Sequence, residues 1–135
     1  MKAYFGRRYT LSASHRLHAA ALSDEQNRAV YGKCNNPHGH GHNYAVEVLV
    51  GGPVMAETGM AMNLVDVDRA VHASILDRFD HANLNLDPLF AAQVPTTENF
   101  CKAVYELLKE ALPAGVLEQV RVEETENNFF EYRGV

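Results

Sequence analysis

Residues 32–44, GKCNNPHGHGHNY, place histidines at alternate positions immediately before an apolar strand pattern, HNYAVEVLV. Alternate residues of a strand share one face and advance about 6.6 Å per pair. His38, His40 and His42 therefore point the same way, but the outer two lie about 13 Å apart. A zinc ion lies about 2.0–2.1 Å from each histidine nitrogen that it binds, so one ion can bind only two neighbouring histidines of the three. Because residue 42 leads directly into the apolar strand, the pattern favours His40 and His42.

A third imidazole is available at the end of another predicted strand, residues 3–15. Its odd positions include Tyr9, Leu11, Ala13 and His15, so one apolar face ends in an imidazole. Three histidines with an open fourth position are typical of a catalytic zinc site. The alternative is a chance loop feature, or core histidines hydrogen-bonded to the backbone. The glycines, the nearby cysteine and the placement of His15 favour a metal.

Cys34 lies in a polar loop beside Lys33. A neighbouring cation or metal lowers a thiol pKa and raises its thiolate fraction, the form that acts as a base or nucleophile. Cys34 could instead be a fourth zinc ligand or an inert surface thiol. Cys101 lies among apolar residues of a predicted helix and is interpreted as a small core residue.

An unexpected carboxylate occurs near the C-terminus. Val120, Val122 and Glu124 share one face of a predicted strand, so Glu124 should point inward. An inward carboxylate can accept two parallel hydrogen bonds from a ligand with adjacent N–H donors. An internal ion pair or an early end of the strand would also explain it.

Asp80 and His81 follow the first predicted long helix. An imidazole beside a carboxylate suits proton transfer. The favourable charge of histidine at a helix C-terminus explains the pair equally well. The residues alone therefore assign them no role.

The chain is expected to form one domain, residues 1–135. Amphipathic helices are predicted over residues 63–79 and from Thr96 or Thr97 to about residue 111. Threonine caps the second helix and Glu98 complements its dipole. A hairpin follows, giving the order ββααββ. This order predicts an α+β fold, an antiparallel four-stranded sheet with two helices on one face.

The net charge is −5, from 12 basic and 17 acidic residues. This balance argues against nucleic acid as a partner, since phosphate binding needs a basic face. No apolar run reaches membrane-spanning length, and MKAYFGRRYT lacks the apolar core of a signal peptide. Two cysteines do not make a disulfide framework. A cytoplasmic protein without membrane partners is expected.

Five segments in sequence order, SASHRL, YGKCNNPHGHGHNY, FDHANLN, PTTENF and EETENN, resemble the signatures of the 6-pyruvoyl tetrahydropterin synthase family. The resemblance runs nearly end to end. It implies the tunnelling fold, in which small sheets close into a barrel by oligomerisation. It also implies a homohexamer, a dimer of trimers with active sites at subunit interfaces.

The resemblance implies Zn²⁺ as the cofactor, held by His15, His40 and His42. It makes Cys34 the base that removes a carbon-bound proton. A proton relay would come from a neighbouring subunit. The relay residues are Asp80 and His81.

For the pterin, the resemblance places Glu124 on the edge formed by the 2-amino group and N3–H. A second segment is also used near the pterin. Its residues are Thr96, Thr97 and Glu98.

The implied substrate is 7,8-dihydroneopterin triphosphate, and the implied product is 6-pyruvoyltetrahydropterin, with triphosphate eliminated and no redox cofactor required. Zinc would polarise the side-chain hydroxyls. Arg16, Arg28 and Lys33 flank the motif loops as candidate phosphate ligands, but the sequence does not assign them.

Three alternatives stay open. A 6-carboxytetrahydropterin synthase of queuosine biosynthesis takes the same substrate but cleaves the side chain. Cys34 precedes His40 by six positions, and CNNP begins at Cys34; the resemblance to the biopterin-type pattern implies the pyruvoyl product. A noncatalytic zinc-binding module would use Cys34 as fourth ligand. A zinc hydrolase is also chemically possible.

Overall fold

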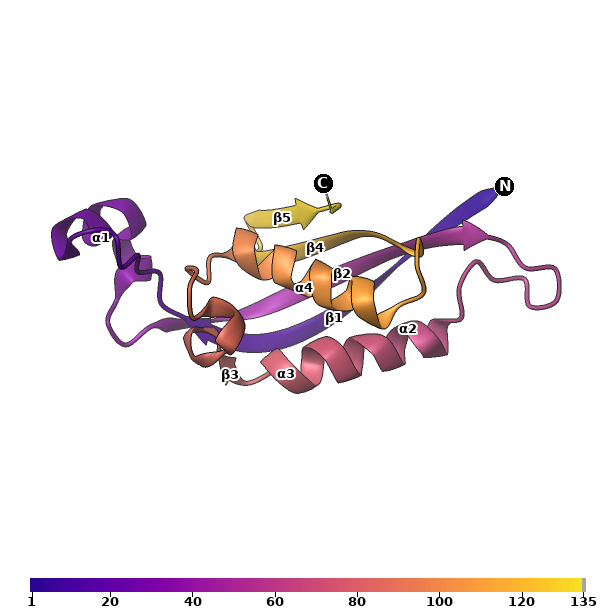
Figure 1. The fold of residues 1–135 in the computed structure, drawn as a ribbon, viewed down its shortest axis with the longest axis horizontal. Coiled ribbons are helices and arrows are strands. Elements are labelled where there is room, and N and C mark those ends of the chain that lie inside the picture. Colours follow the sequence, from indigo (N-terminus) through magenta and orange to yellow (C-terminus); the bar gives the residue numbers. More distant parts are fainter. Residues whose placement is uncertain (135) are drawn as a thin grey trace.

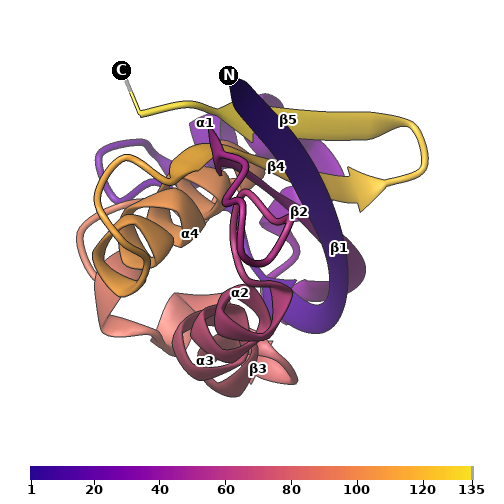
Figure 2. The ribbon, with the colours of Figure 1, turned by 90° about the vertical axis from the view of Figure 1, so that its right-hand side faces the viewer.

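The computed structural model describes residues 1–134 as a single sheet covered by helices on one face (Figures 1 and 2). Strands β1 (Lys2–His15) and β2 (His40–Pro53) form a long antiparallel ribbon. Its register runs from Lys2 opposite Pro53 to His15 opposite His40. Strand β4 (Leu117–Thr125) pairs antiparallel with β2, and β5 (Asn128–Tyr132) pairs antiparallel with β4.

A fifth strand corrects the expected four-stranded antiparallel sheet. The two-residue β3 (Ala82–Asn83) runs parallel to β1, giving the mixed order β3-β1-β2-β4-β5. It follows His81, whose φ of 63° is left-handed. Two residues are too few to produce a recognisable alternation, so sequence reasoning missed this strand.

Both long helices expected from the sequence are present. The first is continuous through α2 (Leu64–Val71), one π turn (His72–Leu76) and α3 (Asp77–Phe79). The second is α4 (Thr97–Ala111), whose N-cap is Thr96. Figure 2 shows both on the same side of the sheet. The α+β class and this layer order are therefore confirmed.

An additional helix, α1 (Asp24–Tyr31), lies between β1 and β2, in a polar segment where the sequence predicted no helix. Ser23 and Gln26 form a reciprocal capping box at its start, which satisfies two otherwise free N–H groups. A 3₁₀ turn, Gly32–Asn35, follows α1. The segment was missed because its polar sequence lacks an apolar stripe. It projects beyond the ends of β1 and β2 (Figure 1).

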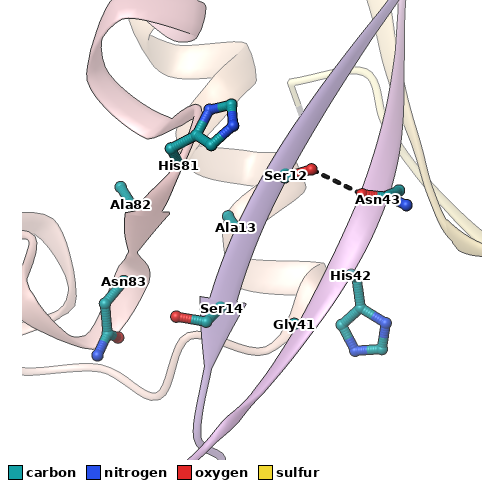
Figure 3. Close-up of a pocket in the computed structure, with 9 residues that line it drawn as sticks. All are labelled: Ser12, Ala13, Ser14, Gly41, His42, Asn43, His81, Ala82 and Asn83. Atoms are coloured by element: carbon teal, nitrogen blue, oxygen red, sulfur yellow. Dashed lines mark hydrogen bonds between the residues drawn. The ribbon is translucent and has the colours of Figure 1, made fainter.

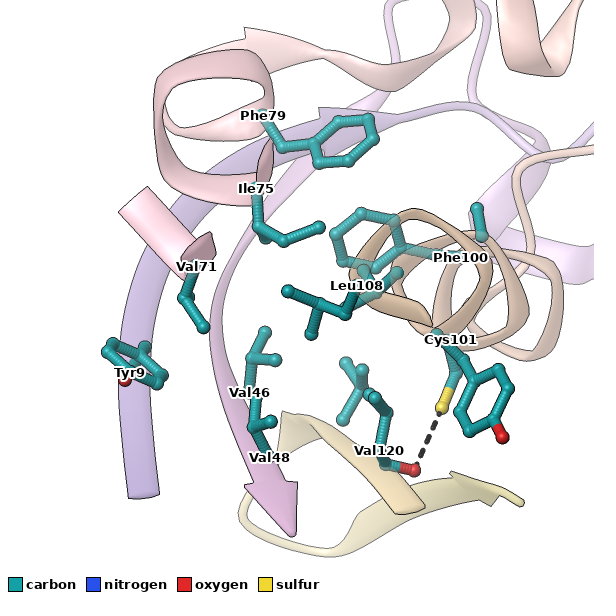
Figure 4. Close-up of a cluster of buried hydrophobic side chains, with 14 of the residues drawn as sticks. Tyr9, Val46, Val48, Val71, Ile75, Phe79, Phe100, Cys101, Leu108 and Val120 are labelled. Carbon is teal, nitrogen blue, oxygen red and sulfur yellow. Dashed lines mark hydrogen bonds between the residues drawn. The ribbon is translucent and has the colours of Figure 1, made fainter. Parts of the chain in front are cut away.

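The core lies between the sheet and the two long helices (Figure 4). Val46, Val48 and Val120 project from the sheet, and Ile75 and Leu108 project from the helices, all fully buried. Burying each such side chain stabilises the fold by about 1.5–3 kcal/mol. The strands are therefore held firmly against the helices, and this fixes the position of the residues at their ends.

Within residues 1–134, no helix has the length and apolar character needed to cross a bilayer. The sheet of this single chain is open, with β3 and β5 as its outer strands. Closure into a barrel by oligomerisation stays a prediction.

Candidate metal centre and active site

Three imidazoles meet where β1 ends and β2 begins. Antiparallel register places His15 opposite His40, and His42 opposite Ala13, so all three share the helix-covered face. The centroid of the His15 ring lies 4.7 Å from that of His40 and 5.1 Å from that of His42. One nitrogen from each ring lies within 4.8 Å of the others. We call His15, His40 and His42 the imidazole cluster.

His38 does not belong to the imidazole cluster. It lies before the first residue of β2, and its side chain is exposed. This agrees with the strand spacing, which allows one ion to contact only an adjacent pair of the three alternating histidines.

The imidazole cluster fits a divalent zinc ion. Nε2 of His15 lies 3.1 Å from Nε2 of His40, close to the roughly 3.3 Å between two nitrogens on a tetrahedral zinc. Nε2 of His42 is buried and has no hydrogen-bond partner among the described residues. A buried nitrogen without a partner is costly unless it binds something.

The protonation states of His15 and His42 also favour a metal site. Burial lowers the pKa of His15, and the charges of His40 and His42 lower it further. Burial also lowers the pKa of His42. Both rings are therefore neutral near neutral pH, which is the form that binds metal. Nδ1 of His15 contacts the carbonyl oxygen of Pro95 at 2.8 Å. Donation to this carbonyl leaves the Nε2 lone pair directed into the cluster.

Glu124 lies beside the imidazole cluster, as the alternation along β4 predicts. Its Oε2 is 4.0 Å from Nε2 of His15, and its side chain is only 16% exposed. The buried Thr97 donates its hydroxyl to Oε2, and Asn128 donates to Oε1 at 3.3 Å. These bonds orient the carboxylate and leave it room to accept further donors from a ligand.

Cys34 lies in the 3₁₀ turn and is half-buried. Its carbonyl accepts a 2.8 Å bond from the Leu17 N–H, which ties the turn to the end of β1. Among the described residues its sulfur is not one of the atoms that gather in the imidazole cluster. Burial raises the pKa of the Cys34 thiol, and the Glu124 charge raises it further. In the metal-free protein the thiol is therefore protonated at neutral pH.

Cys101 has a different environment. It is buried in α4, and its thiol donates to the Val120 carbonyl at 3.4 Å (Figure 4). Burial raises its pKa to about 12. This agrees with its interpretation as a core residue.

Asp80 and His81 do not join the imidazole cluster of their own chain. Asp80 Oδ1 accepts from the Ser12 N–H at 2.9 Å and lies 3.2 Å from Nδ1 of His81. The His81 side chain is 83% exposed. It borders a cavity of about 460 Å³ along β1, β2 and β3. Figure 3 shows His81 and His42 on opposite sides of the β1–β2 pair, and His42 contributes to the lining of the same cavity.

The three residues predicted to lie near the pterin, Thr96, Thr97 and Glu98, have different environments at the start of α4. Thr96 accepts from the Asn99 N–H at 3.2 Å and so caps the helix. Glu98 is exposed in the first turn of the helix. Of this predicted segment, Thr97 alone contacts Glu124 through its side chain.

Sequence reasoning missed two neighbours of the imidazole cluster. The buried Tyr44 ring lies 5.5 Å from that of His42 and 5.1 Å from that of Phe100, so it separates the cluster from the core. Strand alternation from His42 could have identified it. The carbonyl of Pro95 carries no comparable sequence signal.

An α+β domain with a three-histidine centre at the end of its sheet is the class of protein that the fold and site define. A family model for 6-pyruvoyl tetrahydropterin synthase matches residues 4–135. The chain is 48% identical over 134 residues to the human 6-pyruvoyl tetrahydrobiopterin synthase, covering 98% of this chain and 92% of the relative. The Poecilia reticulata synthase is 48% identical over 97% of this chain and 90% of its own length.

A solved structure of Caenorhabditis elegans 6-pyruvoyl tetrahydropterin synthase superposes with a TM-score of 0.96 at 39% identity, covering 100% of this chain and 97% of that chain. A more distant relative is a protein of Archaeoglobus fulgidus named as a putative 6-carboxy-5,6,7,8-tetrahydropterin synthase, 38% identical over 70% of this chain and 75% of its own length. The chain belongs to the 6-pyruvoyl tetrahydropterin synthase family, and it is an enzyme of that lyase type.

Proposed function

We propose that this chain is a zinc-dependent enzyme that converts 7,8-dihydroneopterin triphosphate into 6-pyruvoyltetrahydropterin and triphosphate. The observation that carries the proposal is the imidazole cluster with the Glu124 carboxylate beside it. The 48% identity with the human synthase over 98% of the chain supports the same reaction.

Glu124 is proposed to bind the pterin. Its carboxylate can accept two parallel hydrogen bonds, from the 2-amino group and from N3–H. Thr97 holds the carboxylate in place through its hydroxyl. Thr96 and Glu98 flank it in the chain, and we place them at the rim of the pterin site.

Catalysis begins with removal of a carbon-bound proton by the Cys34 thiolate. Zn²⁺ held by His15, His40 and His42 would polarise the substrate hydroxyls and favour this thiolate. A proton is returned by His81, which Asp80 orients, and triphosphate leaves as the C–O bond breaks. The pterin ring gains the two hydrogens that the side chain loses, so no external oxidant or reductant is needed.

The relay is proposed to act across a subunit interface in a homohexamer. His81 is exposed and lies across β1 and β2 from the His42 ring, outside the imidazole cluster of its own chain, which supports a role in a second copy. Closure of the sheet into a barrel would also protect its open edges. Mixing inactive Cys34→Ala and His81→Ala subunits tests this arrangement. Shared sites predict that hybrids regain activity, and an inactive mixture of verified hybrids contradicts them.

Cys34→Ala tests the base. Zinc content should stay unchanged, while turnover falls by about 10²–10⁴-fold, the usual contribution of a general base. Cys101→Ala is the matched control and should retain turnover. Loss of zinc in Cys34→Ala would instead support the noncatalytic module with sulfur as fourth ligand.

Product identity separates the two pterin enzymes. With zinc and 7,8-dihydroneopterin triphosphate, we expect the pyruvoyl product and no stoichiometric acetaldehyde. Acetaldehyde in an amount equal to substrate consumed would establish side-chain cleavage and overturn the proposed product.

The cytoplasmic location of the protein also stays a prediction, and cell fractionation tests it.

A further inference from the structure

A cavity of about 560 Å³ lies between α1, the 3₁₀ turn and the end of β1. Arg16, Arg28 and Lys33 contribute its lining from these three segments. They are separated in sequence, and the additional helix α1 brings Arg28 to the other two. We call this space the cationic cavity. Its volume falls within the range of ligand sites.

The charge distribution singles out the cationic cavity. The chain has a net charge of −5 and 12 basic residues. Within residues 1–134, seven of these have a carboxylate within 4.0 Å. The five without such a partner among the described residues are Arg16, Arg28, Lys33, Lys102 and Lys109. Three of the five therefore line one cavity, and the single carboxylate there, Asp24, forms no ion pair with them.

The segment that carries Arg28 is anchored by its neighbour. Asn27 is completely buried, and its amide accepts from the Ala19 N–H at 2.7 Å. The same amide contacts three backbone carbonyls, those of Ala19, Leu22 and Ser23. This fixes the start of α1 before any ligand binds, which reduces the ordering cost of binding.

Arg16 is also held in position. Its N–H donates to the Asn85 side chain at 2.7 Å, and its carbonyl accepts from the same side chain at 2.9 Å. Its Nε donates to the carbonyl of Asn35 at 3.2 Å. The rest of the guanidinium group stays available to an anion.

The cationic cavity borders the candidate active site. A neighbouring cavity of about 260 Å³ shares Arg16 and Pro37 with it and is also lined by His15. Lys33 directly precedes Cys34. The three cations therefore lie next to the end of β1 that carries His15 and next to the turn that carries Cys34.

We propose that the cationic cavity binds the triphosphate of the substrate and holds it as it leaves. This rests on the proposed function and assigns a subsite to it. The three cations match a polyanion, and arginine suits phosphate because its N–H groups can donate two parallel bonds. Arg28 lies at the end of the subsite farthest from the sheet, because α1 projects beyond the ends of β1 and β2.

Inorganic tripolyphosphate tests the subsite without turnover. Calorimetric titration should give one site per chain, with affinity about tenfold weaker in Arg28→Gln and a shallower dependence on salt. Lys109→Gln is the matched control, since Lys109 also lacks an ion pair but lies on α4, and it should bind like wild type. Equal affinity in wild type and Arg28→Gln, with unchanged melting temperatures, would overturn the proposal.

Steady-state kinetics test the triphosphate subsite and the proposed reaction separately. In Arg28→Gln we expect KM for 7,8-dihydroneopterin triphosphate to rise about tenfold, with partial recovery in Arg28→Lys. Tripolyphosphate binding that depends on Arg28 in a protein without turnover supports the cavity and rejects the proposed reaction. Turnover whose KM is unaffected by Arg28→Gln rejects the cavity alone.

Discussion

The inner face of the sheet has two ends that differ in chemistry but share the same strands. At one end, β2 and β4 place valines against α4, with Val46, Val48 and Val120 fully buried. At the other end, the same alternation places His42 and Glu124 beside His15. We call these the core end and the site end. The comparison shows that the backbone which packs the core also fixes the distances at the site.

Separate roles for the two ends have a measurable consequence. A substitution at the core end should lower the free energy of unfolding and leave zinc and substrate binding intact. A substitution at the site end should weaken zinc or substrate binding and leave the free energy of unfolding of the metal-free protein unchanged. Tyr44 lies at the boundary and contacts both. The predictions below test this division, from the largest expected effect to the smallest.

Leu108→Ala should have the largest effect on stability. Leu108 is fully buried in α4, and removing such a side chain costs about 2–5 kcal/mol of the free energy of unfolding. Urea unfolding measures the loss, and the folded fraction should still bind one zinc per chain. Leu107→Ala, on the same helix but only partly buried, should cost less. Equal losses for the two variants would contradict the burial argument.

His40→Ala should remove the metal. Losing one of three ligands should weaken zinc binding more than the roughly 10–100-fold seen for residues that only support ligands, and turnover should fall with it. Zinc content by mass spectrometry and urea unfolding of the metal-free protein measure the two ends separately. His38→Ala is the control, because His38 lies in the same segment outside the cluster, and it should retain zinc. A His40→Ala protein with full zinc would break the assignment.

Glu124→Gln should affect substrate binding and leave zinc bound. A charge-assisted hydrogen bond contributes about 1.5–3 kcal/mol, so KM should rise about 10–100-fold. Glu126→Gln provides the comparison, since Glu126 is exposed in the hairpin turn, and its KM should match wild type. An unchanged KM in Glu124→Gln would remove Glu124 from the pterin site.

Asp87→Asn should have the smallest effect, because the Asp87–Arg78 pair belongs to neither end. The Arg78 guanidinium lies 2.8 Å from Asp87 and holds the pKa of that carboxyl below its usual 3.8, with the Leu89 N–H also contributing. A lowered folded pKa means that the pair stabilises the protein above the unfolded value and loses this effect as pH falls through the folded value.

Asparagine keeps the cap on the Leu89 N–H but removes the charge. Asp87→Asn should therefore lose about 0.5–1 kcal/mol at neutral pH and nothing in acid below the folded pKa. Urea unfolding at the two pH values measures the difference. A loss that does not change with pH would exclude the charge as its cause.

Much of the site end could be predicted because strand alternation is a simple rule. It placed His15 at the end of one apolar face and Glu124 after two inward valines, and the structure has both in those positions. Strand spacing limited one ion to an adjacent pair of the three alternating histidines, and the apolar strand after His42 favoured His40 and His42 over His38. The two long helices were predictable from their apolar stripes.

Other elements depend on interactions that are distant in sequence or too local to form a pattern. Helix α1 is held by the buried amide of Asn27 rather than by an apolar face. Strand β3 depends on pairing with Ala13 and Ser14 of β1. Arg16, Arg28 and Lys33 were candidate phosphate ligands that the sequence could not assign, and α1 brings Arg28 to the cavity that the other two line.

The contact between His15 and Pro95 has a consequence for mutational studies. The acceptor is a main-chain carbonyl, so no side-chain replacement can delete it directly. The tautomer of His15 therefore depends on the path of the main chain before α4, and an alanine scan would identify position 95 only as a turn residue. Only a change that displaces this loop, such as an insertion before Thr96, would reveal its effect on the metal.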